Sequence, residues 1–234
     1  MKLKGLVFSC IILLSAVSTA FSQGSDSSQT SSKRKFLEHQ IGLDATIFIQ
    51  NFTFNGGGFV GSPYALNYKL LYQFKKGFIQ SAGLRTGLGY TRMESSSENI
   101  IQKTSNENKS LSYRFRVGIE AQKRINKHWV VYLGYDYVVN ESNDLFKNSF
   151  KSGNNTITTE SNTKMKSEGS GLALGVQFNF NKHISLGTEL SVYDLKGTSE
   201  TISQSGNNIP QVNKTTLNST QIITPAFVNF IVRF

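Results

Sequence analysis

Apolar and polar side chains alternate with a period of two residues along most of the chain beyond residue 36. The alternation occupies eight stretches, at about 40 to 50, 63 to 74, 78 to 92, 111 to 122, 129 to 139, 171 to 180, 184 to 194 and 222 to 234. Of the 47 positions on one face of these stretches, 43 are apolar or aromatic and none is charged. Because this period is typical of β-strands, the pattern predicts an all-β chain of eight strands that share one apolar face.

The opposite face of the predicted strands is rich in glycine. It holds Gly42, Gly83, Gly87, Gly89, Gly118, Gly134, Gly175 and Gly187. Small residues suit the interior of an eight-stranded barrel, which is just wide enough for side chains to fill. A soluble barrel would place its bulky side chains inside and polar ones outside, where glycine only weakens a strand. We therefore predict an eight-stranded antiparallel up-and-down transmembrane β-barrel; a soluble lipocalin-like barrel or a sandwich is the alternative.

The connections between the predicted strands alternate in length. Long ones cover 51 to 62, 93 to 110, 140 to 170 and 195 to 221, and short ones cover 75 to 77, 123 to 128 and 181 to 183. Outer-membrane barrels combine short periplasmic turns with longer extracellular loops. The spacing thus predicts four polar extracellular loops and places both termini in the periplasm. The short turns are basic, which suits anionic head groups or simply solvated turns.

Composition adds limits rather than a function. The chain has 234 residues, a mean hydropathy of -0.26 and a formal net charge of +10, and no uncharged apolar run of 18 residues that would indicate a membrane helix. Residues 1 to 23 have the charged start, apolar core and small-residue end of a signal peptide. Residues 24 to 35 are expected to form a disordered periplasmic tail, and 36 to 234 the barrel domain. The single cysteine, Cys10, lies in the predicted signal peptide, so we expect no disulfide in the barrel.

Eight charged residues alternate onto the inward face. They are Asp44, Lys69, Arg85, Arg114, Arg116, Glu120, Asp136 and Glu189, four of each sign. An unpaired ion in a narrow lumen would cost several kcal/mol, so we predict a charge network that plugs the barrel. The alternative is a wet lumen in which these charges are unconnected.

Aromatic side chains gather near the ends of the predicted strands. At the turn end lie Tyr72, Phe74, Phe78, Trp129, Phe178 and Phe180, and at the loop end Tyr64, Tyr90, Tyr113 and Tyr137. Outer-membrane barrels carry such girdles at both membrane interfaces. We predict that the turn-end group forms the periplasmic interfacial girdle.

Residues that could carry chemistry are few. His39, His128 and His183 have no second metal ligand at a finger or zincin spacing, so no metal or cofactor site is predicted. Ser185 and His183 resemble a nucleophile and its base, but His183 falls in a short turn, Ser185 faces the lumen and no matching acid lies nearby. Gly56 to Gly58 lacks the residues of a phosphate loop. The basic residues form no single groove, so nucleic acid is not expected as a partner.

The last nine residues, Ala226 to Phe234, alternate and end on phenylalanine. Together with the signal peptide and the eight strands, they resemble small outer-membrane β-barrel proteins of the OmpA-transmembrane and OmpX type. In that family the terminal aromatic strand is the signal read by the barrel-assembly machinery, which would assign this role to Val228, Phe230, Val232 and Phe234. Pro225 departs from the pattern, since proline removes a hydrogen-bond donor from the strand.

The resemblance implies a monomeric, non-enzymatic protein of the cell outer membrane, in contact with outer-membrane lipids and with the assembly machinery during biogenesis. We expect surface interaction through the loops, with an unnamed extracellular partner, or a role in envelope integrity. A small porin-like channel, or a conduit for a small or apolar ligand, is the competing class. A lipid-modifying enzyme is the third.

Overall fold

The computed structural model describes residues 36–45, 64–75, 77–99, 103–152, 155–206, 208–224 and 228–234. The expected signal peptide and periplasmic tail lie outside these residues, as do the predicted 51 to 62 loop and Pro225. Within the described ranges, no helix has the length and apolar character needed to cross a bilayer.

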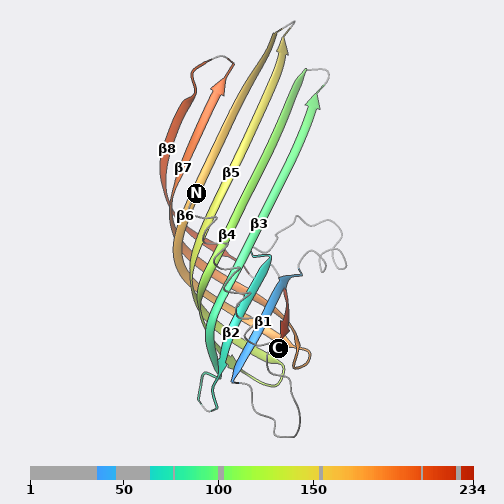
Figure 1. Cartoon of the computed structure of the whole chain (residues 1–234), viewed down its shortest axis with the longest axis vertical. Helices are drawn as coiled ribbons and strands as arrows, with labels where there is room; N and C mark the ends of the chain where they lie inside the picture. The colour runs from blue at the N-terminus through green and yellow to red at the C-terminus, as the bar shows by residue number, and fades with distance from the viewer. Residues whose placement is uncertain are drawn as a thin grey trace, which may run out of the picture. The chain divides into compact units, whose positions relative to one another are not determined.

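Most of the described residues form antiparallel strands (Figure 1). The strands are β1 (Leu37–Asp44), β2 (Leu66–Gln73), β3 (Ser81–Asn99), β4 (Thr104–Arg124), β5 (Trp129–Ser152), β6 (Asn155–Asn179), β7 (Ile184–Ser205), β8 (Gln211–Ile223) and β9 (Asn229–Arg233). Each strand from β1 to β7 pairs with the next in sequence. This confirms the predicted all-β, up-and-down architecture.

The strands close into a ring through β9. On one side β9 pairs with β1, from Gln40↔Arg233 to Asp44↔Asn229, and on the other it pairs with the start of β7. The upper part of β7 pairs instead with β8. β8 and β9 therefore occupy one wall position, the eighth, and they end on either side of the segment that contains Pro225.

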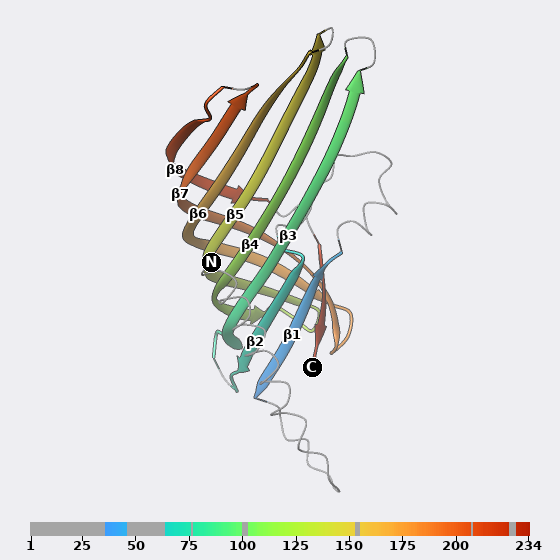
Figure 2. The same cartoon turned by 45° about the horizontal axis from the view of Figure 1, so that its top comes forward.

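Six strands continue past the ring as an open sheet, which we call the extension. It comprises the upper parts of β3 to β8 (Figure 2). The β4–β5 pairing runs without a break from Arg124↔Val130 to Thr104↔Phe150, and β5–β6 from Trp129↔Phe178 to Ser152↔Asn155. The prediction of loops at 93 to 110, 140 to 170 and 195 to 221 was therefore wrong: most of these residues are strand. Apolar alternation stops where lipid stops, whereas backbone pairing between Ser- and Thr-rich strands continues into water.

The apolar face predicted from the alternation is the outer face of the ring. Leu84, Leu133 and Leu174 are 53 to 55% exposed, while their neighbours Arg85, Gly134 and Ala173 are buried. Exposed large apolar residues in such number suit a lipid environment rather than water.

The structure corrects the placement of Tyr64, which the sequence analysis assigns to the aromatic group at the loop end. It is 1% exposed, and its ring lies under the Arg116 guanidinium, with 4.2 Å between the guanidinium carbon and the ring centroid. Tyr64 precedes β2, which begins at Leu66. The inward and outward alternation of that strand therefore does not determine the direction of the Tyr64 side chain.

Candidate functional site

Six of the eight predicted lumen charges meet in one cluster, which we call the lumen cluster. Its members are Lys69, Arg85, Arg116, Glu120, Asp136 and Glu189, each at most 6% exposed. They come from β2, β3, β4, β5 and β7, so the cluster links five wall strands across the lumen. Its three cations and three carboxylates balance.

Arg85 is the centre of the lumen cluster, because it contacts all three carboxylates. Its Nη1 lies 2.9 Å from Glu120 Oε2, its Nε lies 3.1 Å from Asp136 Oδ1 and its Nη2 lies 2.6 Å from Glu189 Oε2. A planar guanidinium with five donors can serve several carboxylates at once, which a lysine cannot do with the same geometry.

The other two cations complete the pairing. Lys69 Nζ lies 2.8 Å from Glu120 Oε1 and 3.7 Å from the centroid of the Tyr132 ring. Arg116 pairs with Glu189 and, at 3.6 Å, with Asp136 Oδ2. Every carboxylate of the cluster therefore has two cationic neighbours, which lowers the cost of burying it.

Glycines of the inward face make room for these long side chains. A Cβ at Gly134 would lie 2.7 Å from Arg85 Nη1, and one at Gly175 would lie 2.0 Å from the Tyr132 ring. A larger residue at either position would displace the Arg85 or the Tyr132 side chain. Two of the glycines that indicated a narrow interior in the sequence therefore have a specific cause.

The structure leaves Asp44 and Arg114 outside the lumen cluster. Both are half-buried and take no part in the six ion pairs. Arg114 instead donates from Nε to Asn140 Oδ1 at 2.8 Å. Both residues lie nearer to the end of the ring from which the extension rises, which we call the mouth. Asp44 is the last residue of β1, and Arg114 lies on β4, closer to the extension than Arg116.

Layers of side chains lie on both sides of the cluster. On the mouth side, Val138, Tyr193 and Leu195 pack together with Ile223, and the Tyr193 hydroxyl donates to Asp136 Oδ2 at 2.9 Å. On the turn side, the lumen holds buried glutamine and asparagine side chains and Arg233.

Little empty space remains around the cluster. The cavity lined by Gln40, Asn67, Lys69, Arg116 and Glu189, among others, has a volume of only about 10 Å³. A second one, at the turn end beside Glu38 and Arg233, is of the same size. About 10 to 15 Å³ is the minimum for a single water molecule. Neither cavity could carry a column of water.

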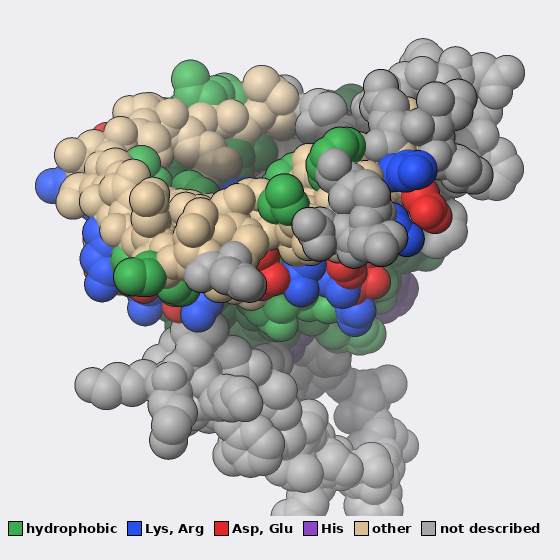
Figure 3. Space-filling model, turned by 90° about the horizontal axis from the view of Figure 1, so that it is seen from above, with side chains coloured by type: hydrophobic (Ala, Val, Ile, Leu, Met, Phe, Trp, Pro, Cys, Tyr) green, Lys and Arg blue, Asp and Glu red, His purple; other side chains and the backbone are tan. Residues whose placement is uncertain are grey.

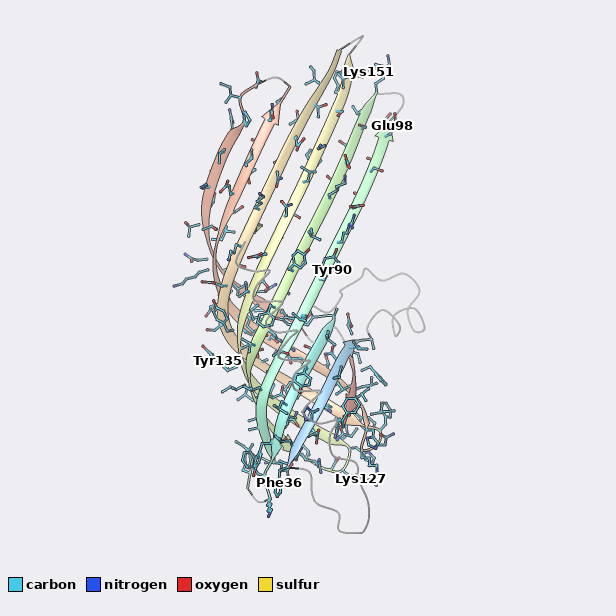
Figure 4. The ribbon with its side chains drawn as sticks, in the orientation of Figure 1. Phe36, Tyr90, Glu98, Lys127, Tyr135 and Lys151 are labelled. Carbon is cyan, nitrogen blue, oxygen red and sulfur yellow. The ribbon has the colours of Figure 1, made fainter. Side chains whose placement is uncertain are left out.

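The turn-end aromatics lie where the sequence predicts, near the short turns. Tyr72, Phe74, Phe78, Trp129 and Phe180 are 43 to 75% exposed. Phe178 contacts the Trp129 ring edge-on, with 4.9 Å between the centroids, and stacks on His128 at 5.6 Å. Figure 4 shows Phe36 and Lys127 at this end of the barrel and Glu98 and Lys151 at the opposite end.

Two turns share a motif that the sequence analysis missed. Asn-Lys-His occurs at 126–128 and again at 181–183. In each turn the asparagine Oδ1 accepts hydrogen bonds from the backbone N–H groups two and three residues later. The histidine Nδ1 lies 3.0 Å from the Asn179 carbonyl oxygen in the first turn and 3.2 Å from the Arg233 carbonyl oxygen in the second. The exact repeat of three residues was the available signal.

These contacts give the histidines structural roles. His183 Nδ1 lies near the Arg233 carbonyl, whereas the Ser185 hydroxyl is buried and accepts from Arg233 Nη2 at 2.7 Å. His39 Nδ1 lies 2.8 Å from the Tyr68 hydroxyl. Among the described residues, no group of three or more His, Cys, Asp or Glu side chains could hold a metal ion.

The four residues assigned to the assembly signal follow the wall alternation. Phe230 and Phe234 are exposed on the lipid-facing side, and Val228 and Val232 are half-buried. The backbone N–H of Phe234 donates to the His39 carbonyl at 3.0 Å. The terminal residue therefore also belongs to the pairing that closes the ring.

One comparison with known proteins identifies the type of chain. The profile of the outer membrane protein beta-barrel domain family matches residues 11–220. The crystal structure of CarO from Acinetobacter baumannii is similar, with a TM-score of 0.37 and 14% sequence identity, over 87% of this chain and 98% of that one. A search of curated proteins finds no match.

Proposed function

Because the chain belongs to the outer membrane protein beta-barrel domain family and is therefore an outer-membrane barrel protein, we propose that it acts as a sealed membrane anchor. In this proposal the barrel neither conducts nor catalyses. It holds the extension of β3 to β8 outside the cell, where that sheet interacts with the surroundings. Both ends of the described barrel, near Phe36 and Phe234, then face the periplasm.

The lumen cluster is the observation that carries this proposal. Six ions from five strands meet at nine-tenths burial or more, with layers of packed side chains on both sides. An open pore hydrates its charges individually, whereas a narrow interior requires opposite charges to pair. The pairing, together with cavities of about 10 Å³, supports a plugged barrel.

The proposed orientation rests on charge and on strand length. The short turns carry Lys75, Lys123, Arg124 and Lys127 without an acid, and the other end carries the long hairpins. In outer-membrane barrels the longer segments face outward. A non-enzymatic role is supported by the structural use of Ser185 and His183, each of which is bonded to Arg233.

Single-channel recording tests the proposal directly. The purified, refolded protein in a planar bilayer should show no steady conductance, while a porin refolded in the same way provides the positive control. A variant in which Arg85, Glu120 and Glu189 are all replaced by glycine should admit ions. A stable open channel in the wild-type protein would replace the sealed anchor with a small pore.

A further inference from the structure

The two faces of the extension have different chemistry. Side chains alternate between the faces, and the register of β3 to β8 shows which of them share a face. We call the face that continues the lumen wall the inner face, and the one that continues the lipid-facing wall the outer face. Both faces lie beyond the ring.

The inner face is almost free of charge. It is formed by 35 residues, of which 25 are Ser, Thr, Asn or Gln and two, Arg114 and Asp144, are charged. The 35 are Thr91, Met93, Ser95, Ser97 and Asn99 of β3; Thr104, Asn106, Asn108, Ser110, Ser112 and Arg114 of β4; Asn140, Ser142, Asp144, Phe146, Asn148 and Phe150 of β5; Ile157, Thr159, Ser161, Thr163, Met165 and Ser167 of β6; Leu195, Gly197, Ser199, Thr201, Ser203 and Ser205 of β7; and Gln211, Asn213, Thr215, Leu217, Ser219 and Gln221 of β8.

The outer face carries the charges instead. Over the same strands it holds eight cations and eight carboxylates: Arg92, Glu94, Glu98, Glu107, Lys109, Glu141, Lys147, Lys151, Glu160, Lys164, Lys166, Glu168, Asp194, Lys196, Glu200 and Lys214. Directly opposed residues form ion pairs, at 3.1 Å for Lys147–Glu160 and 3.0 Å for Lys214–Glu200. The hydrogen bond and charge of Lys109 lower the pKa of Glu107. Figure 3 shows the charged side chains along the outer edge of this end and uncharged ones over most of its middle.

Solubility alone does not explain this division. Both faces border solvent, and hydration and β-propensity act on a strand whichever way a side chain points. If solubility were the only requirement, charge would be distributed over both faces. Two charges against sixteen indicate a requirement that acts on the inner face only. A surface that binds an uncharged ligand is under such a requirement, since a charge that is desolvated without a partner is costly.

We infer that the inner face of the extension binds an uncharged oligosaccharide chain. Hydroxyl and amide side chains both donate and accept hydrogen bonds, which matches a ligand whose surface consists of hydroxyl groups. Rows of these side chains run across the sheet, such as Asn106, Asn148, Thr159 and Ser205 in directly opposed positions. An extended chain laid across the strands would meet four to six such groups in succession.

Apolar side chains within the inner face supply the second part of the recognition. Phe146 and Phe150 lie four residues apart on β5 and are 42 and 45% exposed. Flat apolar rings surrounded by hydrogen-bonding groups suit the C–H faces of sugar rings.

The inference depends on the proposed function only in that the extension faces outward, and the test distinguishes the two. The purified protein in detergent is titrated with fluorescent dextran and mannan, which are uncharged, and with heparin, which is anionic. We expect saturable binding of an uncharged probe. Phe146→Ser with Phe150→Ser should weaken it about tenfold or more. Leu145→Ser with Lys147→Ser, on the outer face of the same strand, should leave it unchanged.

Ser199→Glu and Thr198→Glu provide a second matched pair, since the two residues are adjacent on β7 and face opposite ways. The inner-face carboxylate of Ser199→Glu should abolish binding, and that of Thr198→Glu should not. An unchanged heat-modifiable band on gels shows that each variant is folded.

The inference is overturned if no uncharged probe binds, if heparin alone binds, or if inner- and outer-face variants lose binding equally. Binding that appears only together with dimerisation also overturns it, in favour of a second copy of the chain as the occupant. None of these outcomes bears on conductance, so the sealed anchor stands or falls separately.

Discussion

Replacing Arg85 with methionine removes the one cation that contacts all three carboxylates of the lumen cluster. Glu120 keeps Lys69 as a partner, and Glu189 keeps Arg116. Of its two ion pairs, Asp136 keeps only the longer one, at 3.6 Å to Arg116, besides the hydrogen bond from the Tyr193 hydroxyl. Three carboxylates then face two cations, and one negative charge is left without compensation in a region where the side chains are at most 7% exposed.

Breaking a buried ion pair by removing one partner typically costs about 3 to 5 kcal/mol. We expect a loss of that size in the free energy of unfolding for Arg85→Met. Arg92→Met is the matched control, because Arg92 also pairs with a glutamate, Glu94, but its side chain is 61% exposed. Ion pairs in that setting contribute little, so this variant should unfold like the wild type.

Neutralising one carboxylate should restore the balance. In Arg85→Met with Asp136→Asn, the pairs Lys69–Glu120 and Arg116–Glu189 remain and no charge is in excess. We expect more than half of the lost stability to return. Urea unfolding in lipid vesicles measures five proteins: the wild type, Arg85→Met, Asp136→Asn, the double variant and the Arg92→Met control. Trp129, the only tryptophan in the sequence, reports on the membrane-embedded end by its fluorescence.

The reasoning is refuted if Arg85→Met unfolds at the wild-type urea concentration. It is equally refuted if the double variant loses the sum of the two single losses, because the charges would then act independently in a wet lumen.

Three further predictions concern the wall, the orientation and the assembly. Leu133→Arg should cost about 2 to 4 kcal/mol of unfolding free energy because it places a charge in lipid, while Leu145→Arg, on the same face of β5 but in the extension, should be tolerated; equal urea midpoints would contradict the membrane assignment. Cysteine in place of Lys151 should react with a membrane-impermeant maleimide on intact cells and cysteine in place of Lys127 should not, with the opposite labelling requiring an inverted barrel. Deleting Phe234 should reduce the heat-modifiable barrel in isolated outer membranes, and wild-type amounts would show that the terminal aromatic is dispensable.

The sequence predicts the wall of the barrel well because lipid and lumen impose opposite demands on alternate residues. Leu84 and Arg85, or Leu133 and Gly134, are adjacent, and a shift of one residue would place a charge in lipid. The prediction fails at Tyr64, just before β2, where the alternation no longer constrains the side chain. It also fails beyond residues 92 and 139, where no lipid demands apolar side chains and the outer face becomes charged instead. An alternation of charged with uncharged residues, as at Lys164, Lys166 and Glu168, was the overlooked evidence of strand.

The members of the lumen cluster could be predicted, but not their partners. Which charges face inward follows from parity, whereas their height follows from the strand register, and that depends on pairings far apart in the sequence, such as Arg85 with Gly118 and Lys69 with Arg85. Asp44 and Arg114 have the correct parity and the wrong height. The repeated Asn-Lys-His turns were readable in the sequence, but their contacts with the Asn179 and Arg233 carbonyls were not.

The length of β5 sets how far the molecule stands from the bilayer. β5 has 24 residues, which at about 3.4 Å per residue makes a strand roughly 80 Å long. An apolar band about 25 Å tall, crossed at a tilt of about 40°, uses roughly 33 Å of it. The remainder rises to roughly 35 Å above that band, several times the thickness of a head-group layer. On the proposed orientation, an approaching cell or polymer therefore meets the β5–β6 tip before it meets lipid, and a pull on that tip acts on the wall strands through a long lever.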